Sequence, residues 1–302
     1  MDKMNDFVIE DGMLTEYIGD GGRVIIPDGV RSIGEEAFAA CELITEILIP
    51  NTVVSIGNKA FEGCEGITKI TLPDNLNFIG RFAFVGCTSL EEINISESNS
   101  AYKSLFGVLY SKDGRTLICH PAAKKGGTFF VPHNVQRIDI GAFWKCKSLK
   151  CIMLPFGLKE ICYGAFNECV SLSVISIPST VTTLGGLAFG SCKALTSITL
   201  PKSIVEISNF TFSYCTGLKS FKVHNGIKKI GNYAFFNCKN LTEIYIGSSV
   251  NLLGECALSY CNSPLTVKYA GSKPTFYKLI EKQGWKKGEG KYIVYYNQEE
   301  PT

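Results

Sequence analysis

Long apolar runs, histidine and charge of one sign are all scarce in this chain of 302 residues. No run of roughly 18 apolar residues occurs, so the sequence predicts no membrane-spanning helix and no insertion into a membrane. The three histidines have no metal-ligand spacing, and no Cys-x-x-Cys pair accompanies them. A formal net charge of +2 gives no general attraction to nucleic acid. We therefore expect no metal, no cofactor, no nucleic-acid partner and no catalytic residue.

A secretion leader is also missing, because residues 1–6 contain neither an apolar segment nor a small-residue cleavage site. A chain that truly starts at Met1 would remain in the cytoplasm. A chain whose leader was removed would be secreted or held at the cell surface. The sequence leaves both locations open.

Cysteine, in contrast, is abundant and regularly spaced. Nine of the thirteen cysteines recur every 23 residues, apart from one longer interval: Cys41, Cys64, Cys87, Cys146, Cys169, Cys192, Cys215, Cys238 and Cys261. A phenylalanine stands three residues before eight of them, at Phe38, Phe61, Phe84, Phe143, Phe166, Phe189, Phe212 and Phe235, and Leu258 takes this place before the ninth. A fixed period of this length predicts a solenoid, in which each repeat is too small to bury a core alone and stacks on its neighbours.

Each repeat contains two short extended segments. In one repeat, apolar residues alternate at Ile175 and Ile177 and end at Pro178, and a second segment carries Val181 and Leu184. Such alternation is typical of half-buried strands. We therefore expect about nine turns whose equivalent strands stack into parallel sheets, with the phenylalanines forming a buried aromatic spine.

A glycine recurs after the second segment in most repeats, and an alanine directly precedes the phenylalanine. We interpret the glycine as a position of positive φ, which a tight turn requires. Cys162 stands at this position in one repeat and should force a local adjustment of the backbone there. The alanine indicates that adjacent backbones approach each other closely.

The repeated string I-P-x-x-V-x-x-I-G-x-x-A-F-x-x-C-x-x-L resembles the BspA-type leucine-rich repeat, a 23-residue class found in bacterial surface proteins and in some protists. The resemblance covers residues 24 to 270. It implies a right-handed solenoid of the α/β repeat class, with a parallel sheet on its concave face and mostly short strands and turns. It also implies protein binding and adhesion, and no catalysis.

The repeat pattern is interrupted once and changes at both ends. Alternation around Asp113-Gly114 is a strong hairpin pattern, and a similar pattern surrounds Asp11-Gly12. Near the end, residues 273–284 read as an amphipathic helix, followed by a strand at residues 292–296. We divide the chain into an N-terminal β-hairpin cap (1–23), turns 1–3 (24–95), a β-hairpin insert (96–131), turns 4–9 (132–270) and a C-terminal cap of helix and strand (271–302).

The cysteine ladder admits disulfide, metal and packing interpretations. Parallel Cβ atoms about 4.8 Å apart miss the separation that disulfides prefer. Metal binding lacks the histidines, so thiols that pack as small apolar groups explain one cysteine per turn best. A hydrolase site built in the insert on Cys119 and His120 is a distant alternative, because neighbours in a strand point to opposite faces.

Solenoids bind partners along their repeated strand face. In the central turns this face is poor in charge, and Cys151, Met153 and Val174 form an apolar patch directly after the insert. Either the insert folds over this patch or a partner binds there. The candidate partner-binding residues are Cys151, Met153, Val174, Ser176, Ser197, Thr199, Lys222 and Tyr245, with Trp144 and Phe236 as secondary candidates.

The sequence thus favours a non-catalytic, monomeric module that binds a protein or glycan ligand in adhesion or another cell-surface interaction. An intracellular scaffold protein is the alternative hypothesis.

Overall fold

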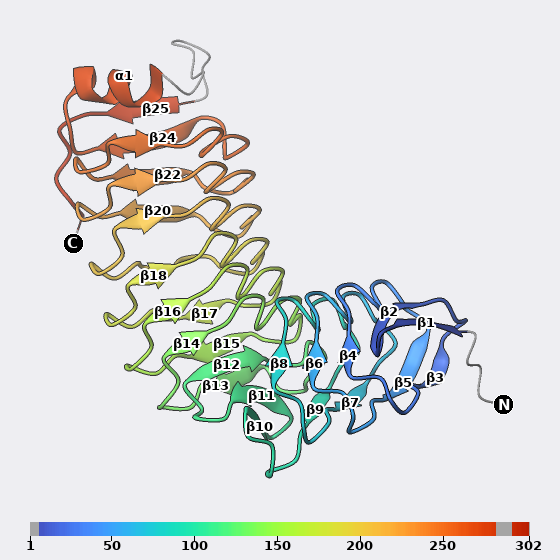
Figure 1. Ribbon diagram of the computed structural model, residues 1–302. Helices are drawn as coiled ribbons and strands as arrows, with labels where there is room; N and C mark the ends of the chain where they lie inside the picture. Colours follow the sequence, from blue (N-terminus) through green and yellow to red (C-terminus); the bar gives the residue numbers. More distant parts are fainter. Residues whose placement is uncertain (1–5, 282–291, 302) are drawn as a thin grey trace. The chain divides into compact units, whose positions relative to one another are not determined.

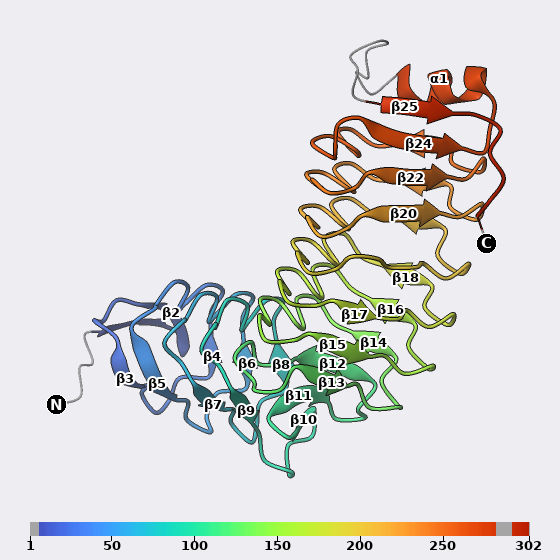
Figure 2. The ribbon, with the colours of Figure 1, turned by 180° about the vertical axis from the view of Figure 1, so that it is seen from behind.

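The structure is a computed structural model, and it describes residues 6–281 and 292–301. The chain divides into two compact units, Met1–Gly126 with Ile138–Ser148, and Gly127–Arg137 with Leu149–Thr302. Each unit is a stack of turns built from short parallel strands (Figure 1). The same strands are seen from behind in Figure 2. The β-solenoid predicted from the sequence is therefore confirmed.

In the first unit, two sheets run along the stack. One sheet contains β3 (Gly22–Ile25), β5 (Ile44–Leu48), β7 (Lys69–Thr71) and β9 (Glu92–Asn94). The other contains β1 (Phe7–Glu10), β2 (Met13–Tyr17), β4 (Ser32–Ile33), β6 (Ser55–Ile56) and β8 (Phe78–Ile79). The insert adds β10 (Tyr102–Leu105), β11 (Val108–Ser111) and β12 (Thr116–Cys119), and β14 (Arg137–Ile138) lies where the two units adjoin in sequence.

The second unit repeats this plan. Its first sheets are β13 (Thr128–Phe130), β15 (Cys151–Met153) and β17 (Val174–Ile175), and then β20 (Ser220–Val223), β22 (Glu243–Ile246), β24 (Leu265–Tyr269) and β25 (Tyr292–Tyr295). The strands of the opposite side are β16 (Glu160–Ile161), β18 (Thr183–Leu184), β19 (Glu206–Ile207), β21 (Lys229–Ile230) and β23 (Leu252–Leu253). The helix α1 (Lys273–Glu281) precedes β25.

The predicted aromatic spine forms the centre of both units. In the first unit the ring centroids of Phe38 and Phe61 are 5.2 Å apart, with the planes 14° from parallel. In the second unit Phe189 stacks on Phe166 at 5.3 Å and on Phe212 at 5.6 Å. These rings are fully buried. Stacking of equivalent side chains at the strand spacing thus supplies the core that a single turn lacks.

The structure has about 12 turns, and the nine predicted are too few. Segments that we assigned to caps and insert also form turns of the stack. Tyr17 takes the spine position in the N-terminal hairpin, stacking on Phe38 at 5.3 Å. His120 takes it in the insert, since its N–H donates to the Ala142 carbonyl as the N–H of Phe61 does to that of Ala83. The sequence pattern hid these turns because neither carries the repeat's phenylalanine.

The glycine interpretation is wrong. The recurrent glycines, such as Gly80 and Gly185, are absent from the residues with positive φ. A Cβ on Gly80 would instead lie 2.4 Å from the backbone nitrogen of Asn58 in the preceding turn. The adjacent backbone therefore excludes any side chain here. Cys162 also has no positive φ, so the adjustment expected there is not needed.

Left-handed residues occur at two other positions of the turn, one before the alanine and one two residues after the phenylalanine. They include Glu36 and Ala40 in one turn and Lys59 and Gly63 in the next. These two positions bend the chain around the spine residue and bring it back to the next strand.

The cysteine ladder is buried, and all thirteen cysteines have free thiols. Most ladder thiols donate a hydrogen bond to the carbonyl of the spine residue in the preceding turn. For example, Cys64 Sγ lies 3.1 Å from the Phe38 oxygen, and Cys215 Sγ lies 3.0 Å from the Phe189 oxygen. Burial raises the pKa of both thiols to about 12. The cysteine thus packs as a small apolar group, as predicted, and also satisfies a backbone acceptor.

The ends and the insert agree in part with the sequence. The hairpin at Asp113-Gly114 joins β11 and β12, but a second hairpin at Phe106-Gly107 pairs β10 with β11 and was not predicted. The helix buries the predicted stripe of Phe276, Leu279 and Ile280. Residues 282–284 of the predicted helix lie outside the described residues.

Candidate functional site

The sheet of β13, β15 and β17 presents an apolar outer face. In this sheet Phe130 pairs with Met153, and Cys151 pairs with Val174. Because side chains alternate along a strand, Ile152 points into the core while its neighbours point outward. Phe130, Met153 and Val174 are 71%, 50% and 56% exposed. We call these three residues the apolar patch.

The insert does not fold over the apolar patch as one of our two alternatives supposed. Its last residues instead form β13, which pairs edge to edge with β15. Phe130 therefore enlarges the patch, and sequence reasoning missed it because the residue lay in the segment assigned to the insert. Its neighbours Thr128 and Phe129 show the strand alternation that could have identified it.

The structure separates the predicted partner-binding residues into two groups. Met153, Val174, Ser176, Ser197 and Thr199 are exposed, and Cys151 is half-buried. Ser197 and Thr199 lie in an extended segment to which no strand is assigned.

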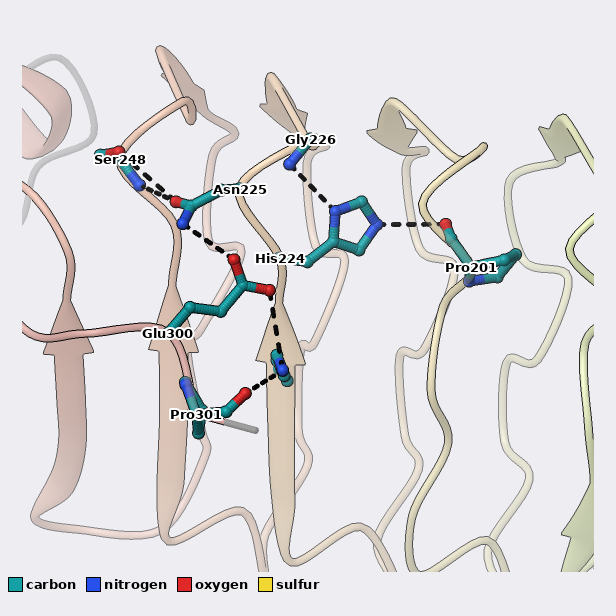
Figure 3. A network of polar contacts seen from close by, with 8 residues as sticks. Pro201, His224, Asn225, Gly226, Ser248, Glu300 and Pro301 are labelled. Carbon is teal, nitrogen blue, oxygen red and sulfur yellow. Dashed lines mark hydrogen bonds and ion pairs between the residues drawn. The ribbon is translucent and has the colours of Figure 1, made fainter.

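Lys222 and Tyr245 form the second group, and part of the chain covers them. Residues 297–301 follow β25 and run back to β22 and β20 (Figure 3). Glu300 forms an ion pair with Lys222 at 3.6 Å. Tyr245 is 3% exposed. These two residues therefore belong to an occupied surface.

The equivalent face of the first unit is ionic. Arg23 pairs with Glu46 at 3.1 Å, and Lys69 pairs with Glu92 at 2.9 Å, in both cases across adjacent strands. A groove of about 410 Å³ lies over β5 and β7. Exposed ion pairs contribute about 0–1 kcal/mol each, so these charges affect recognition more than stability.

The distant hydrolase alternative finds no support at Cys119 and His120. His120 is 6% exposed and stacks on Phe143 at 4.9 Å, with Nδ1 3.4 Å from the Cys146 thiol. Burial lowers the pKa of His120 to about 4 and raises that of Cys119 to about 12. A nucleophilic cysteine needs a lowered pKa. The cavity beside Cys119 has a volume of about 70 Å³, well below that of ordinary ligand sites.

A second exposed surface is an aromatic edge on the second unit. Phe210 stacks on Tyr233 at 4.9 Å, and Phe236 contacts both Tyr214 and Tyr260. Four of these five residues, Phe236 excepted, have positive φ, which bulky side chains rarely adopt. The secondary candidate Phe236 thus sits inside a ring cluster.

The other secondary candidate, Trp144, is half-buried and packs edge-on against Phe82 at 5.8 Å. Within residues 6–281 and 292–301, no cluster of histidine, cysteine and carboxylate side chains is suited to a metal ion. The same part of the chain contains no helix long and apolar enough to cross a bilayer.

Short parallel strands repeated every 23 residues, sheets along the stack and a buried aromatic spine define a class of protein, the leucine-rich-repeat solenoids. Within that class the chain belongs to the family of the BspA type leucine rich repeat region. The family model matches residues 22–108 and 128–266 as 6 copies.

Similar solved structures come from bacteria. A leucine rich cell surface protein from Faecalibacterium prausnitzii is 29% identical with a TM-score of 0.64, and the match covers 85% of this chain and 62% of that protein. The chain therefore spans less than two thirds of that protein's length. No curated protein matches this sequence.

Two further structures share the fold alone. A leucine-rich repeat protein from Eubacterium ventriosum is 24% identical with a TM-score of 0.61, covering 82% of this chain and 88% of that one. The pneumococcal vaccine antigen PcpA is 20% identical with a TM-score of 0.64, covering 92% and 69%.

Proposed function

We propose that this chain is a non-catalytic, monomeric binding module of a bacterial cell surface, and that it holds a protein partner on the apolar patch. The supporting observation is the exposure of Phe130, Met153 and Val174 side by side on one sheet. Exposed apolar groups of this kind mark interaction sites.

The surroundings of the patch favour a protein over a nucleic acid. Ser176, Ser197 and Thr199 are exposed on the following turns and offer hydroxyl groups without charge. Apolar anchors beside a polar rim are typical of protein interfaces, whereas nucleic-acid sites are rich in Lys and Arg. The surface location rests on the F. prausnitzii protein, which is described as a cell surface protein.

The test compares two substitutions that add the same charge at equal exposure. Val174→Lys changes the patch, and Val205→Lys changes a valine on the opposite side that is 54% exposed. Fluorescently labelled chain is bound to cultured epithelial cells, with and without protease treatment of the cells. We expect Val174→Lys to reduce binding about tenfold, as for loss of one interface anchor.

Val205→Lys should bind like the parent chain, and protease treatment should remove the receptor. Equal binding by both variants would refute the patch as the site. Binding that survives protease but is lost on periodate treatment would indicate a glycan partner in place of a protein.

A further inference from the structure

Two turns of the second unit depart from the repeat at the end of the sheet strand. His224 and Gly247 stand where the preceding turn has Pro201. His224 Nδ1 accepts a hydrogen bond from the Gly226 N–H at 3.0 Å, and Nε2 lies 3.1 Å from the Pro201 carbonyl oxygen (Figure 3). Because Nδ1 accepts, the proton resides on Nε2, which donates to Pro201. A neutral histidine thus fixes the loop that carries Asn225.

Asn225 is oriented by the next turn. Its Oδ1 accepts from the Ser248 N–H at 2.9 Å, so its Nδ2 faces away and donates to Glu300 Oε2 at 2.9 Å. A Cβ on Gly247 would lie 2.7 Å from Asn225 Oδ1. The absence of a side chain at Gly247 therefore makes room for the Asn225 amide. The break in the proline pattern builds this amide donor.

Lys222 supplies the positive charge at the same place. Its Nζ lies 3.6 Å from Glu300 Oε1 and also donates to the carbonyl of Pro301. Tyr245 pairs with Lys222 in the sheet register and is buried beside it. The Tyr245 hydroxyl makes no hydrogen bond of normal geometry among the described residues. Burial, and then the Glu300 carboxylate, raise the pKa of Tyr245.

The segment that fills this place is held unevenly. Its first part is anchored by main-chain bonds, from the Asn297 N–H to Gly271 and from the Gln298 N–H to Tyr269. Among the described residues, Glu300 contacts the sheet through the side chains of Lys222 and Asn225. The outer part can therefore leave without breaking a strand or a backbone ladder.

We propose that Lys222, Asn225 and Tyr245 form a binding site for the carboxylate of an extended acidic peptide, and that residues 297–301 occupy it in place of a partner's segment. The observed occupant is itself an extended acidic stretch, Glu299-Glu300-Pro301. Its single contacting carboxylate leaves the Tyr245 hydroxyl unsatisfied, so a partner that also accepts from this hydroxyl binds better and displaces it. This site is separate from the apolar patch and does not depend on it.

The first experiment asks whether the site accepts such a peptide from outside. The probe is a hexapeptide with the sequence of residues 297–302, titrated by NMR into the full chain carrying Glu300→Ala. We expect binding to Glu300→Ala that is about tenfold tighter than to the parent chain, where the tethered segment competes. Adding Lys222→Gln should abolish it, and the peptide with glutamine at both glutamates should not bind.

The matched control is Lys268→Gln, because Lys268 lies one strand further in the same row and pairs with Glu243 at 2.7 Å. This variant in the Glu300→Ala background should bind the peptide unchanged. Equal binding to the parent and Glu300→Ala chains would overturn occupancy by residues 297–301. Equal loss in the Lys222 and Lys268 variants would overturn the site in favour of general charge attraction.

A second readout follows the tethered segment itself. Cleavage after Glu299 by a glutamate-specific protease should be about tenfold faster in Lys222→Gln than in the parent, since losing a charged partner frees the segment. Lys268→Gln should cleave at the parental rate. Unchanged cleavage in Lys222→Gln would show that the segment is not held there and would overturn the proposal, whatever the fate of the apolar patch.

Discussion

Replacement of Phe189 by alanine tests the aromatic spine where it is best enclosed. The ring is fully buried and stacks within 7° of parallel on Phe166 and within 2° on Phe212. Both neighbouring turns therefore lose a contact when the ring is removed.

The expected loss of stability follows from three contributions. Burial of the side chain contributes about 1.5–3 kcal/mol, and each stacked pair adds about 0.5–1.5 kcal/mol beyond that. Partial collapse of the cavity returns some of this loss, so we expect a net decrease of about 3–5 kcal/mol in the free energy of unfolding. Phe189→Leu should cost less than about 1.5 kcal/mol, because a leucine of similar volume, Leu258, already occupies this position in another turn.

Urea denaturation followed by circular dichroism measures the change, and amide hydrogen exchange locates it. Exchange should accelerate first in the turns of Phe166 and Phe212, since a repeat interacts mainly with its neighbours. Phe156→Ala is the control, because Phe156 is 74% exposed and should change stability by less than about 0.5 kcal/mol. If the two alanine variants unfold at the same urea concentration, the spine is not the core of the stack.

Three further predictions concern the glycines, the histidine and the thiols. Gly80→Ala should destabilise more than Gly63→Ala in urea denaturation, because a Cβ meets the Asn58 nitrogen at 2.4 Å in the first but nothing nearer than 3.6 Å in the second; the reverse order would contradict the close-approach explanation. His120 has a folded pKa of about 4, below its ordinary 6.5, so the unfolded chain takes up the proton first and stability should fall by up to about 3 kcal/mol between pH 7 and pH 4. His120→Phe should remove this part of the pH dependence, and an unchanged pH profile would refute the assignment. Thiol titration should detect nine or more additional thiols only after unfolding, whereas four or more native disulfides would contradict the packing interpretation.

Much of the fold could be predicted because a repeat reports the same environment many times. The phenylalanine and cysteine positions identified the buried centre, and the alternation around residues such as Ile175 identified the strands. The prediction failed where one residue performs a role in a different chemical form. Tyr17 and His120 occupy spine positions without being phenylalanine, and their turns were therefore assigned to a cap and an insert.

The candidate site could be predicted only in part. Met153 and Val174 lie on an outward face because strand periodicity places them there. Phe130 joined the patch through pairing of β13 with β15, and pairing between segments is not visible in local periodicity. Lys222 and Tyr245 have the same periodicity as Met153, yet residues 297–301 cover them.

The sequence by itself determined the period, the buried spine and the family, because these depend on contacts between equivalent positions 23 residues apart. The tertiary structure decided the reason for the glycines, the acceptor of each thiol and the surface that remains free. Those features depend on which atoms of another turn or of a distant segment approach a residue. Backbone proximity across the stack excludes a Cβ at Gly80, and a segment 75 residues away places a carboxylate on Asn225.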